Sequence, residues 1–116
     1  MPEKIVIFAF QGNPTCFVHV LLNALDLKEH GHHVEIVLEG EATTLVEKLL
    51  QPANPLHQLY RKTRETGLIT AVCRACATKL GALPVIEAER LPLVGAMSGH
   101  PAMAPYLGKG FRIITM

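Results

Sequence analysis

The chain has 116 residues, 49% of them hydrophobic, which is typical of one domain that buries its own core, so we expect a single domain over residues 1–116. Its 11 basic and 10 acidic residues are scattered and leave a formal net charge of +1, and aromatic residues make up 5%, so nucleic acid and anionic membranes are unexpected partners. The sequence shows no signal-peptide pattern and no apolar run long enough to cross a bilayer, so we expect a soluble, cytoplasmic protein.

Short apolar runs alternate with helical patterns along the chain. The runs predict strands over 5–10, 34–38, 68–72, 93–95 and 111–115. Helical spacing predicts helices over 16–30, 41–50, 56–66, 74–80 and 101–109. Gly31, Gly67 and Gly110 each follow a helical pattern and precede a strand, as expected of residues that end helices. The alternation predicts an α/β fold with a mainly parallel five-stranded sheet.

The segment FQGNPTC, residues 10–16, follows the first predicted strand and is a candidate binding loop. Gly12 and Asn13 form a turn that exposes backbone N–H groups, and Cys16 follows it. We expect these residues to line the crevice at the carboxyl ends of the strands, where α/β sheets bind ligands. Burial at the start of a helix is the alternative for Cys16.

The first predicted helix carries two adjacent apolar stripes, which are residues 18, 21, 22 and 25 and residues 17, 20, 24 and 27. A sheet covers only one side of a helix, so the second stripe predicts a subunit interface and a homo-oligomer. Further along, Glu39 directly follows the second predicted strand; we expect it to be a solvated turn carboxylate, and a position facing the pocket is the alternative.

Two cysteines lie three residues apart in LITAVCRACATKLGA, residues 68–82. Cys73 ends the third predicted strand, and Cys76 falls in the first turn of the next helix. The positive end of that helix and the neighbouring Arg74 are expected to lower the pKa of at least one thiol and so raise its reactivity. Free cysteines are also often buried as small apolar residues, and the spacing permits a reversible disulfide, so both alternatives stay open.

A zinc site is a further alternative, but it requires four ligands and the CxxC motif supplies two. Cys16 and His100 follow predicted strands and would be the third and fourth ligands. His100 lies in MSGHPAMAPY, residues 97–106, where Ser98 is the expected N-cap of the last helix. Within that loop His100 is expected either to act as a proton donor or thiolate partner for Cys73, or to cap the loop through a hydrogen bond.

The motif AVCRACATKLGA, together with KIVIFAFQGNP, HVEIVLEGEA and SGHPAMAPYLGKGFRIITM, resembles the DsrE/DsrF-like family of small sulfur-relay proteins. The resemblance implies a flavodoxin-like three-layer fold that assembles as a dimer, trimer or hexamer. It also implies a cysteine at the end of this strand that accepts sulfane sulfur as a persulfide and passes it to a partner, and Cys73 matches that cysteine. Cys76 departs from the single-cysteine members and is a candidate for resolving a persulfide into a disulfide.

These observations together predict an intracellular sulfur-relay protein, sulfurtransferase-like if it is an enzyme, that needs no metal or organic cofactor. Cys73 is the expected acceptor, with Cys76 as the assisting or resolving thiol and His100 polarising the site. The residues expected to bind the substrate are Gly12, Asn13, Cys16, Arg74 and Ser98. Expected partners are copies of the chain and sulfur donor and acceptor proteins. A CxxC zinc or redox protein and a non-catalytic oligomeric binding protein remain the alternatives.

Overall fold

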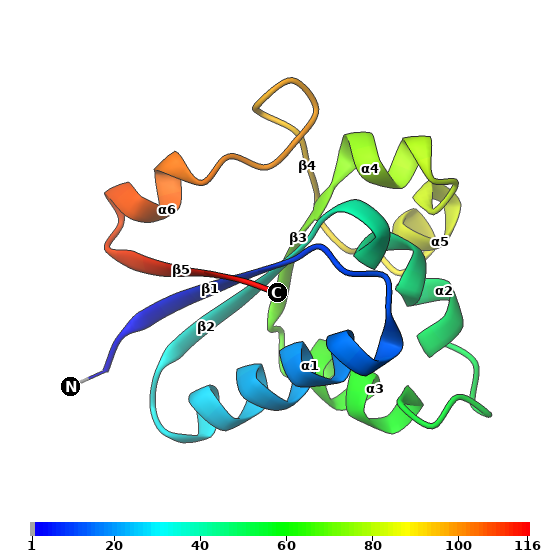
Figure 1. Ribbon diagram of the computed structural model, residues 1–116, viewed down its shortest axis with the longest axis horizontal. Helices are drawn as coiled ribbons and strands as arrows, with labels where there is room; N and C mark the ends of the chain where they lie inside the picture. Colours follow the sequence, from blue (N-terminus) through cyan, green and yellow to red (C-terminus); the bar gives the residue numbers. More distant parts are fainter. Residues whose placement is uncertain (1) are drawn as a thin grey trace.

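The computed structural model describes residues 2–116 and contains a five-stranded sheet in which every strand pair is parallel (Figure 1). The strands are β1 (Lys4–Ala9), β2 (His33–Leu38), β3 (Ile69–Cys73), β4 (Leu93–Val94) and β5 (Phe111–Thr115). Their order across the sheet is β4-β3-β2-β1-β5. The predicted α/β class and the five-stranded sheet are confirmed. The strand order differs from the 2-1-3-4-5 order of flavodoxin, so the likeness to that fold lies in the layers and the parallel pairing.

The helical segments are α1 (Pro14–Glu29), the 3₁₀ helix η1 (Gly40–Thr44), α2 (Leu45–Leu49), α3 (His57–Glu65), α4 (Arg74–Lys79), α5 (Leu83–Ala88) and α6 (Ala104–Gly108). The single helix predicted over 41–50 is therefore divided into η1 and α2. The sequence prediction missed α5, because six residues are too few to display helical periodicity. None of the helices in residues 2–116 is long and apolar enough to cross a membrane.

The direction of each connection explains which face of the sheet its helices cover. The steps from β1 to β2, β3 and β4 all run the same way across the sheet, so right-handed crossovers place their helices on one face. The return from β4 to β5 crosses to the opposite edge, and α6 lies on the other face (Figure 1). The sheet is thus thickly covered on one side, and on the other side only the short α6 and its connecting loop are seen in the described chain.

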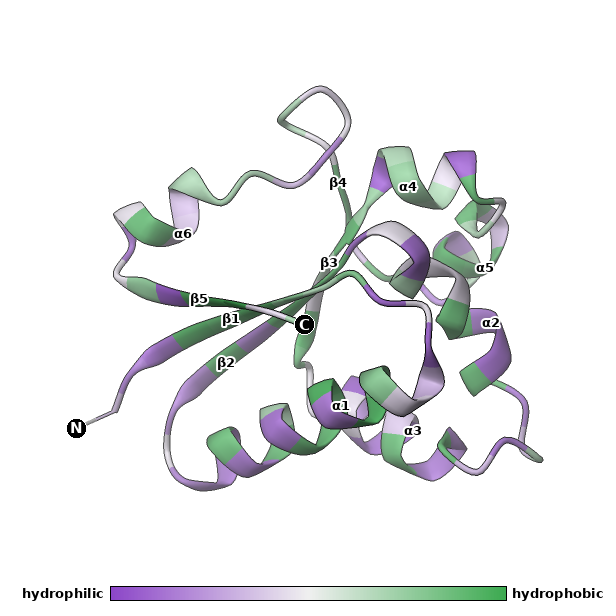
Figure 2. Cartoon of the chain, viewed as in Figure 1, coloured by the Kyte–Doolittle hydropathy of each residue, from purple (hydrophilic) through white to green (hydrophobic). Residues whose placement is uncertain are grey.

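Alternate residues of the strands build two separate parts of the core. In β1, Ile5 and Ile7 belong to the cluster that packs against the larger helical layer, whereas Val6 and Phe8 belong to the cluster beneath α6. Tyr106 of α6 packs edge-on against Phe8, with ring centroids 5.6 Å apart. Figure 2 shows the resulting concentration of hydrophobic residues in the central strands. Burial on both faces accounts for the nearly continuous apolar strands in the sequence.

The two apolar stripes of α1 are buried to different extents. The fully buried residues of this helix are Phe17, Val20, Leu21 and Ala24. Val18 and Leu25 are half-buried, and Leu22 is 50% exposed. One stripe therefore packs into the core of this chain and the other is incompletely covered. The stripe predicted to form the interface, residues 17, 20, 24 and 27, is the one that packs into the core, whereas residues 18, 22 and 25 are incompletely covered. Homo-oligomerisation stays a prediction.

Candidate functional site

Glu39 and Cys73 leave the sheet side by side at the carboxyl ends of β2 and β3. The parallel register pairs Leu38 with Val72, so the residue that follows Leu38 emerges beside the residue that follows Val72. Val37 and Ala71 face the α6 side, and strand alternation directs Glu39 and Cys73 to the same side. Glu39 is 7% exposed and Cys73 is 0% exposed. The expectation that Glu39 is a solvated turn carboxylate was wrong.

A tight hairpin after β4 positions His100. The backbone N–H of Met97 donates to the carbonyl of His100, and the N–H of His100 donates to the carbonyl of Met97, both at 2.9 Å. Ser98 (φ +51°) and Gly99 (φ +92°) both adopt positive φ, as a type I′ two-residue turn requires. Ser98 is not the N-cap of the last helix, because α6 begins only at Ala104 and its N-cap is Met103.

The hairpin packs tightly against the start of α4. The Gly99 carbonyl accepts a hydrogen bond from the Ala75 N–H at 2.9 Å. A Cβ atom added at Gly99 would lie 3.0 Å from the Ala75 Cβ, and one added at Gly95 would lie 3.0 Å from the Gly99 carbonyl oxygen. Both glycines therefore permit a close approach that side chains would prevent, and this approach holds His100 over the strand ends.

Replacing Gly99 by alanine tests whether this packing positions His100. We expect Gly99→Ala to lower the free energy of unfolding by about 1–3 kcal/mol, because alanine is strained at positive φ, and also to impair the chemistry of the site. Gly67→Ala is the matched control, since Gly67 has φ +78° and no neighbouring atom within 4 Å of an added Cβ. Urea unfolding measures the stability of both variants, and the rate of Cys73 alkylation in the folded protein measures whether the hairpin still covers the site. Equal alkylation rates for both variants would contradict the positioning role of the hairpin.

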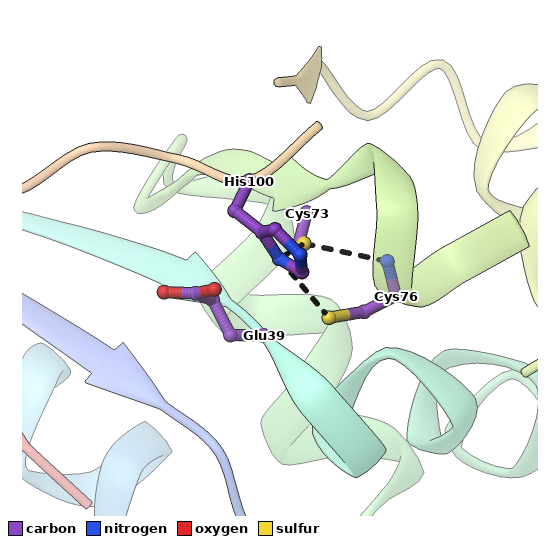
Figure 3. A group of neighbouring side chains, drawn as sticks. All are labelled: Glu39, Cys73, Cys76 and His100. Carbon is purple, nitrogen blue, oxygen red and sulfur yellow. Dashed lines mark hydrogen bonds between the residues drawn. The ribbon is translucent and has the colours of Figure 1, made fainter. Parts of the chain in front are cut away.

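One imidazole nitrogen contacts both sulfur atoms. His100 Nδ1 lies 3.1 Å from Cys73 Sγ and 3.8 Å from Cys76 Sγ. Cys73 is the N-cap of α4, and its sulfur accepts a hydrogen bond from the Cys76 N–H at 3.4 Å. Figure 3 shows His100 between the end of β3 and the first turn of α4. The structure thus brings together the three residues expected to carry the chemistry, and it adds Glu39.

Burial controls the titration of the innermost thiol. It raises the pKa of Cys73 to about 12, and the hydrogen bond to the Cys76 side chain and the nearby Glu39 carboxylate act in the same direction. The hydrogen bond from the Cys76 N–H opposes the shift but does not overcome it. Burial also raises the pKa of Glu39, partly offset by His100 and Cys73. The predicted lowering of a thiol pKa is therefore wrong for Cys73, because desolvation outweighs the helix start. Cys76 is half-buried and is the more accessible thiol of the pair.

In the first loop, Gly12 and Asn13 make local contacts and Cys16 faces solvent, whereas Phe10 lines the pocket beside the cluster. The Asn13 Oδ1 accepts a hydrogen bond from the Thr15 N–H at 2.8 Å and caps α1. Gly12 packs closely against Glu41, because a Cβ atom added at Gly12 would lie 2.7 Å from the Cβ atom of Glu41. Cys16 is exposed on α1 and does not belong to the group of neighbouring donor atoms, and Arg74 is exposed at the start of α4. The roles predicted for these residues stay predictions.

A pocket of about 490 Å³ opens beside the cluster. Its lining consists of Phe10, Glu39, Met97, His100, Pro101, Ala102, Met103 and Ala104. Among the described residues that line it, Glu39 and His100 are the ionisable ones, so the cluster borders an otherwise apolar depression. Placement of Glu39 in the pocket was the less favoured alternative from the sequence, and its position directly after a strand, like that of Cys73, was the signal for it.

Comparison with known proteins places this architecture in a family. Residues 4–116 match the family model described as the DsrE/DsrF-like family. The chain belongs to that family. The predicted resemblance is thus confirmed, and this DsrE/DsrF-like family is associated with sulfur relay.

Similar DsrE/DsrF-like proteins include uncharacterised archaeal relatives. The chain is 34% identical over 120 residues to the uncharacterised protein MJ0733 of Methanocaldococcus jannaschii, covering 100% of this chain and 96% of that protein. An uncharacterised protein of Archaeoglobus fulgidus is 33% identical over 45 residues, which is 39% of this chain and 74% of that protein. The solved structure of the conserved protein of unknown function BT1422 from Bacteroides thetaiotaomicron has a TM-score of 0.68 at 22% identity, covering 98% and 95% of the two chains. That likeness shows a shared fold.

Proposed function

We propose that this DsrE/DsrF-like protein relays sulfane sulfur as a cysteine persulfide on Cys73 and Cys76. The observation that carries the proposal is the shared contact of His100 Nδ1 with both sulfur atoms, at 3.1 and 3.8 Å. A neutral imidazole nitrogen accepts a proton from one thiol and returns it to the other, so the same histidine serves both positions. The family's association with sulfur relay supports the same chemistry.

Cys76 is the thiol that first meets a donor, because it is half-buried whereas Cys73 is sealed. His100 takes the proton of the Cys76 thiol, and the thiolate attacks the outer sulfur of a donor persulfide R–S–SH. A sulfur–sulfur bond forms at Cys76 as the donor's own sulfur–sulfur bond breaks, and the electron pair leaves with the donor sulfur. The donor leaves as the thiol R–SH, having taken up one proton. One persulfide is lost and one is gained, so no outside oxidant or reductant is needed.

Cys73 receives the sulfur in the second step. Its sulfur attacks the outer sulfur of the Cys76 persulfide, which forms a Cys73 persulfide and restores the Cys76 thiol, with His100 again carrying the proton. The product then lies in the buried position, where water and small reductants have little access. Attack on the inner sulfur would instead form a Cys73–Cys76 disulfide and release hydrogen sulfide. The two outcomes differ in mass, because the first adds one sulfur atom and the second removes two hydrogen atoms.

Intact-mass measurement after incubation with glutathione persulfide, in the presence of a chelator, tests this function. We expect the wild-type protein to gain one sulfur atom and the Cys76→Ser variant to gain none within the same time. The Cys73→Ser variant is expected to gain a sulfur at Cys76 and lose it quickly to added thiol, because the protected position is missing. Cys16→Ser is the matched control and is expected to behave as the wild type, since Cys16 lies outside the cluster.

Two results would contradict this relay. Sulfur uptake that depends on Cys16 would show that the persulfide does not form at this site, and unchanged uptake in the Cys76→Ser variant would show that Cys76 does not receive the sulfur first. A wild-type protein that takes up no sulfur while remaining folded would favour a non-catalytic binding protein instead.

A further inference from the structure

Four side chains with metal-binding atoms meet where β2, β3, α4 and the hairpin after β4 converge. They are Glu39, Cys73, Cys76 and His100, and one donor atom from each lies within 4.8 Å of all the others (Figure 3). Two sulfurs, one imidazole nitrogen and one carboxylate oxygen form a mixed donor set of the kind that Zn²⁺ accepts in tetrahedral geometry. Bond lengths of about 2.0–2.3 Å place the donors of such a site roughly 3.3–3.8 Å apart. The observed separations of 3.1 and 3.8 Å from His100 Nδ1 to the two sulfurs are close to that range.

The donors come from elements that the fold holds firmly. The β2–β3 register fixes Glu39 beside Cys73, and the first turn of α4 places Cys76 three residues after Cys73. The type I′ turn, docked on Ala75, fixes His100. The geometry is therefore largely formed without a ligand, so binding an ion requires only small side-chain movements.

A cation also fits the polarity of the cluster. The carboxyl group of Glu39 and the thiol of Cys73 are buried here beside the imidazole of His100, so an ion bound among them would be shielded from bulk water. The two thiols lose their protons to solvent as their sulfurs bind the ion, and no electrons are transferred.

We propose that Glu39, Cys73, Cys76 and His100 form a tetrahedral binding site for a zinc-class divalent cation. The site goes beyond sulfur relay and does not rest on it, because ion binding is measured without any sulfur donor. The metal site and the sulfur relay are nevertheless linked, because the ion would bind both sulfur atoms that the persulfide chemistry requires. Metal-loaded protein is therefore unable to accept sulfur, and removal of the metal restores the thiols.

Titration with Zn²⁺ alone, in competition with a chromophoric chelator, measures the stoichiometry and the dissociation constant. We expect one Zn²⁺ per chain, and a dissociation constant more than about 100-fold higher in Cys73→Ser, Cys76→Ser and His100→Ala, since loss of even an outer-shell partner costs 10–100-fold. Glu39→Gln is expected to raise it about tenfold, because the amide oxygen is a weaker, uncharged ligand. Cys16→Ser and Glu41→Gln are the matched controls and are expected to bind as the wild type does. Stoichiometric binding that survives loss of Cys76, or that needs Cys16, would overturn the proposal.

Two measurements on the wild-type protein remain decisive if a variant fails to fold. Co²⁺ is expected to produce the visible absorption of a tetrahedral ion together with near-ultraviolet thiolate charge-transfer bands. Zn²⁺ is expected to slow alkylation of Cys76 at least tenfold and to leave that of Cys16 unchanged, as mapped by peptide mass. An octahedral Co²⁺ spectrum, or equal alkylation of Cys76 with and without Zn²⁺, would overturn the metal site. Sulfur uptake by metal-free protein is a separate result, so each proposal fails or holds independently.

Discussion

In the native protein at pH 7, Cys73 is expected to react with iodoacetamide about 1,000-fold more slowly than the same residue in the unfolded chain. Burial raises the pKa of Cys73 from 9.0 to about 12, so the fraction of thiolate, the reactive form, falls by about three powers of ten. The complete burial of the side chain adds a steric barrier to this effect. Timed alkylation in the presence of a chelator, followed by peptide mass analysis, measures the rate at each cysteine.

The pH dependence of the alkylation rate separates the effect of the raised pKa of Cys73 from the steric effect of its burial. If the raised pKa limits the reaction, the alkylation rate of Cys73 increases about tenfold per pH unit from pH 7 up to the point where the fold is lost, because its pKa lies well above that range. Cys16 is exposed and serves as the internal reference for reagent access. Native and unfolded rates that agree within a few-fold at Cys73 would show that this thiol is reachable and ionised in the folded protein.

The second large effect is expected from His100→Asn. Asparagine retains a polar side chain of similar reach but accepts a proton far less readily than imidazole, so we expect the rate of sulfur uptake to fall by about 10²–10⁴-fold. Stopped-time intact-mass measurements on metal-free protein supply the rate, and circular dichroism checks that the variant is folded. His19→Asn is the matched control, because His19 is exposed on α1 and lies outside the cluster.

The outcome for His100→Asn also tests how the histidine acts. If it transfers protons, raising the pH is expected to recover part of the lost rate, because hydroxide then deprotonates Cys76 directly. An uptake rate that is unchanged from the wild type would assign His100 a structural role in the hairpin. A lost rate with no recovery at high pH would indicate that the substitution displaces the sulfurs.

The placement of Cys73 at the start of a helix and its burial act in opposite directions on its reactivity. Its sulfur caps α4 and accepts the Cys76 N–H, which favours the thiolate, yet the covering hairpin excludes the water that would solvate that charge. In the proposed relay the two cysteines would divide the work, because Cys76 is half-buried and can receive sulfur, whereas Cys73 is buried and can retain it. Opening of the hairpin would expose Cys73 to an acceptor.

The sequence by itself determined the alternation of strands and helices, the parallel sheet and the strand-end position of Cys73. These features follow from local rules, since apolar runs buried on both faces have no period and glycines end helices through their own backbone freedom. The CxxC spacing likewise placed Cys76 in the first turn of α4. The boundaries of α6 were harder to predict, because Ser98 and Pro101 match the chemistry of a helix start while the chain around Ser98 actually forms a type I′ turn.

Only the tertiary structure decided which side chains meet and how deeply they lie. Glu39 joins the site because the β2–β3 register places it beside Cys73, and a one-residue shift of that register would direct it to the other face. Cys16 stays outside because α1 carries it away from the cluster. The burial of Cys73 comes from a hairpin more than twenty residues further along the chain, and desolvation by such a distant segment leaves no local pattern in the sequence.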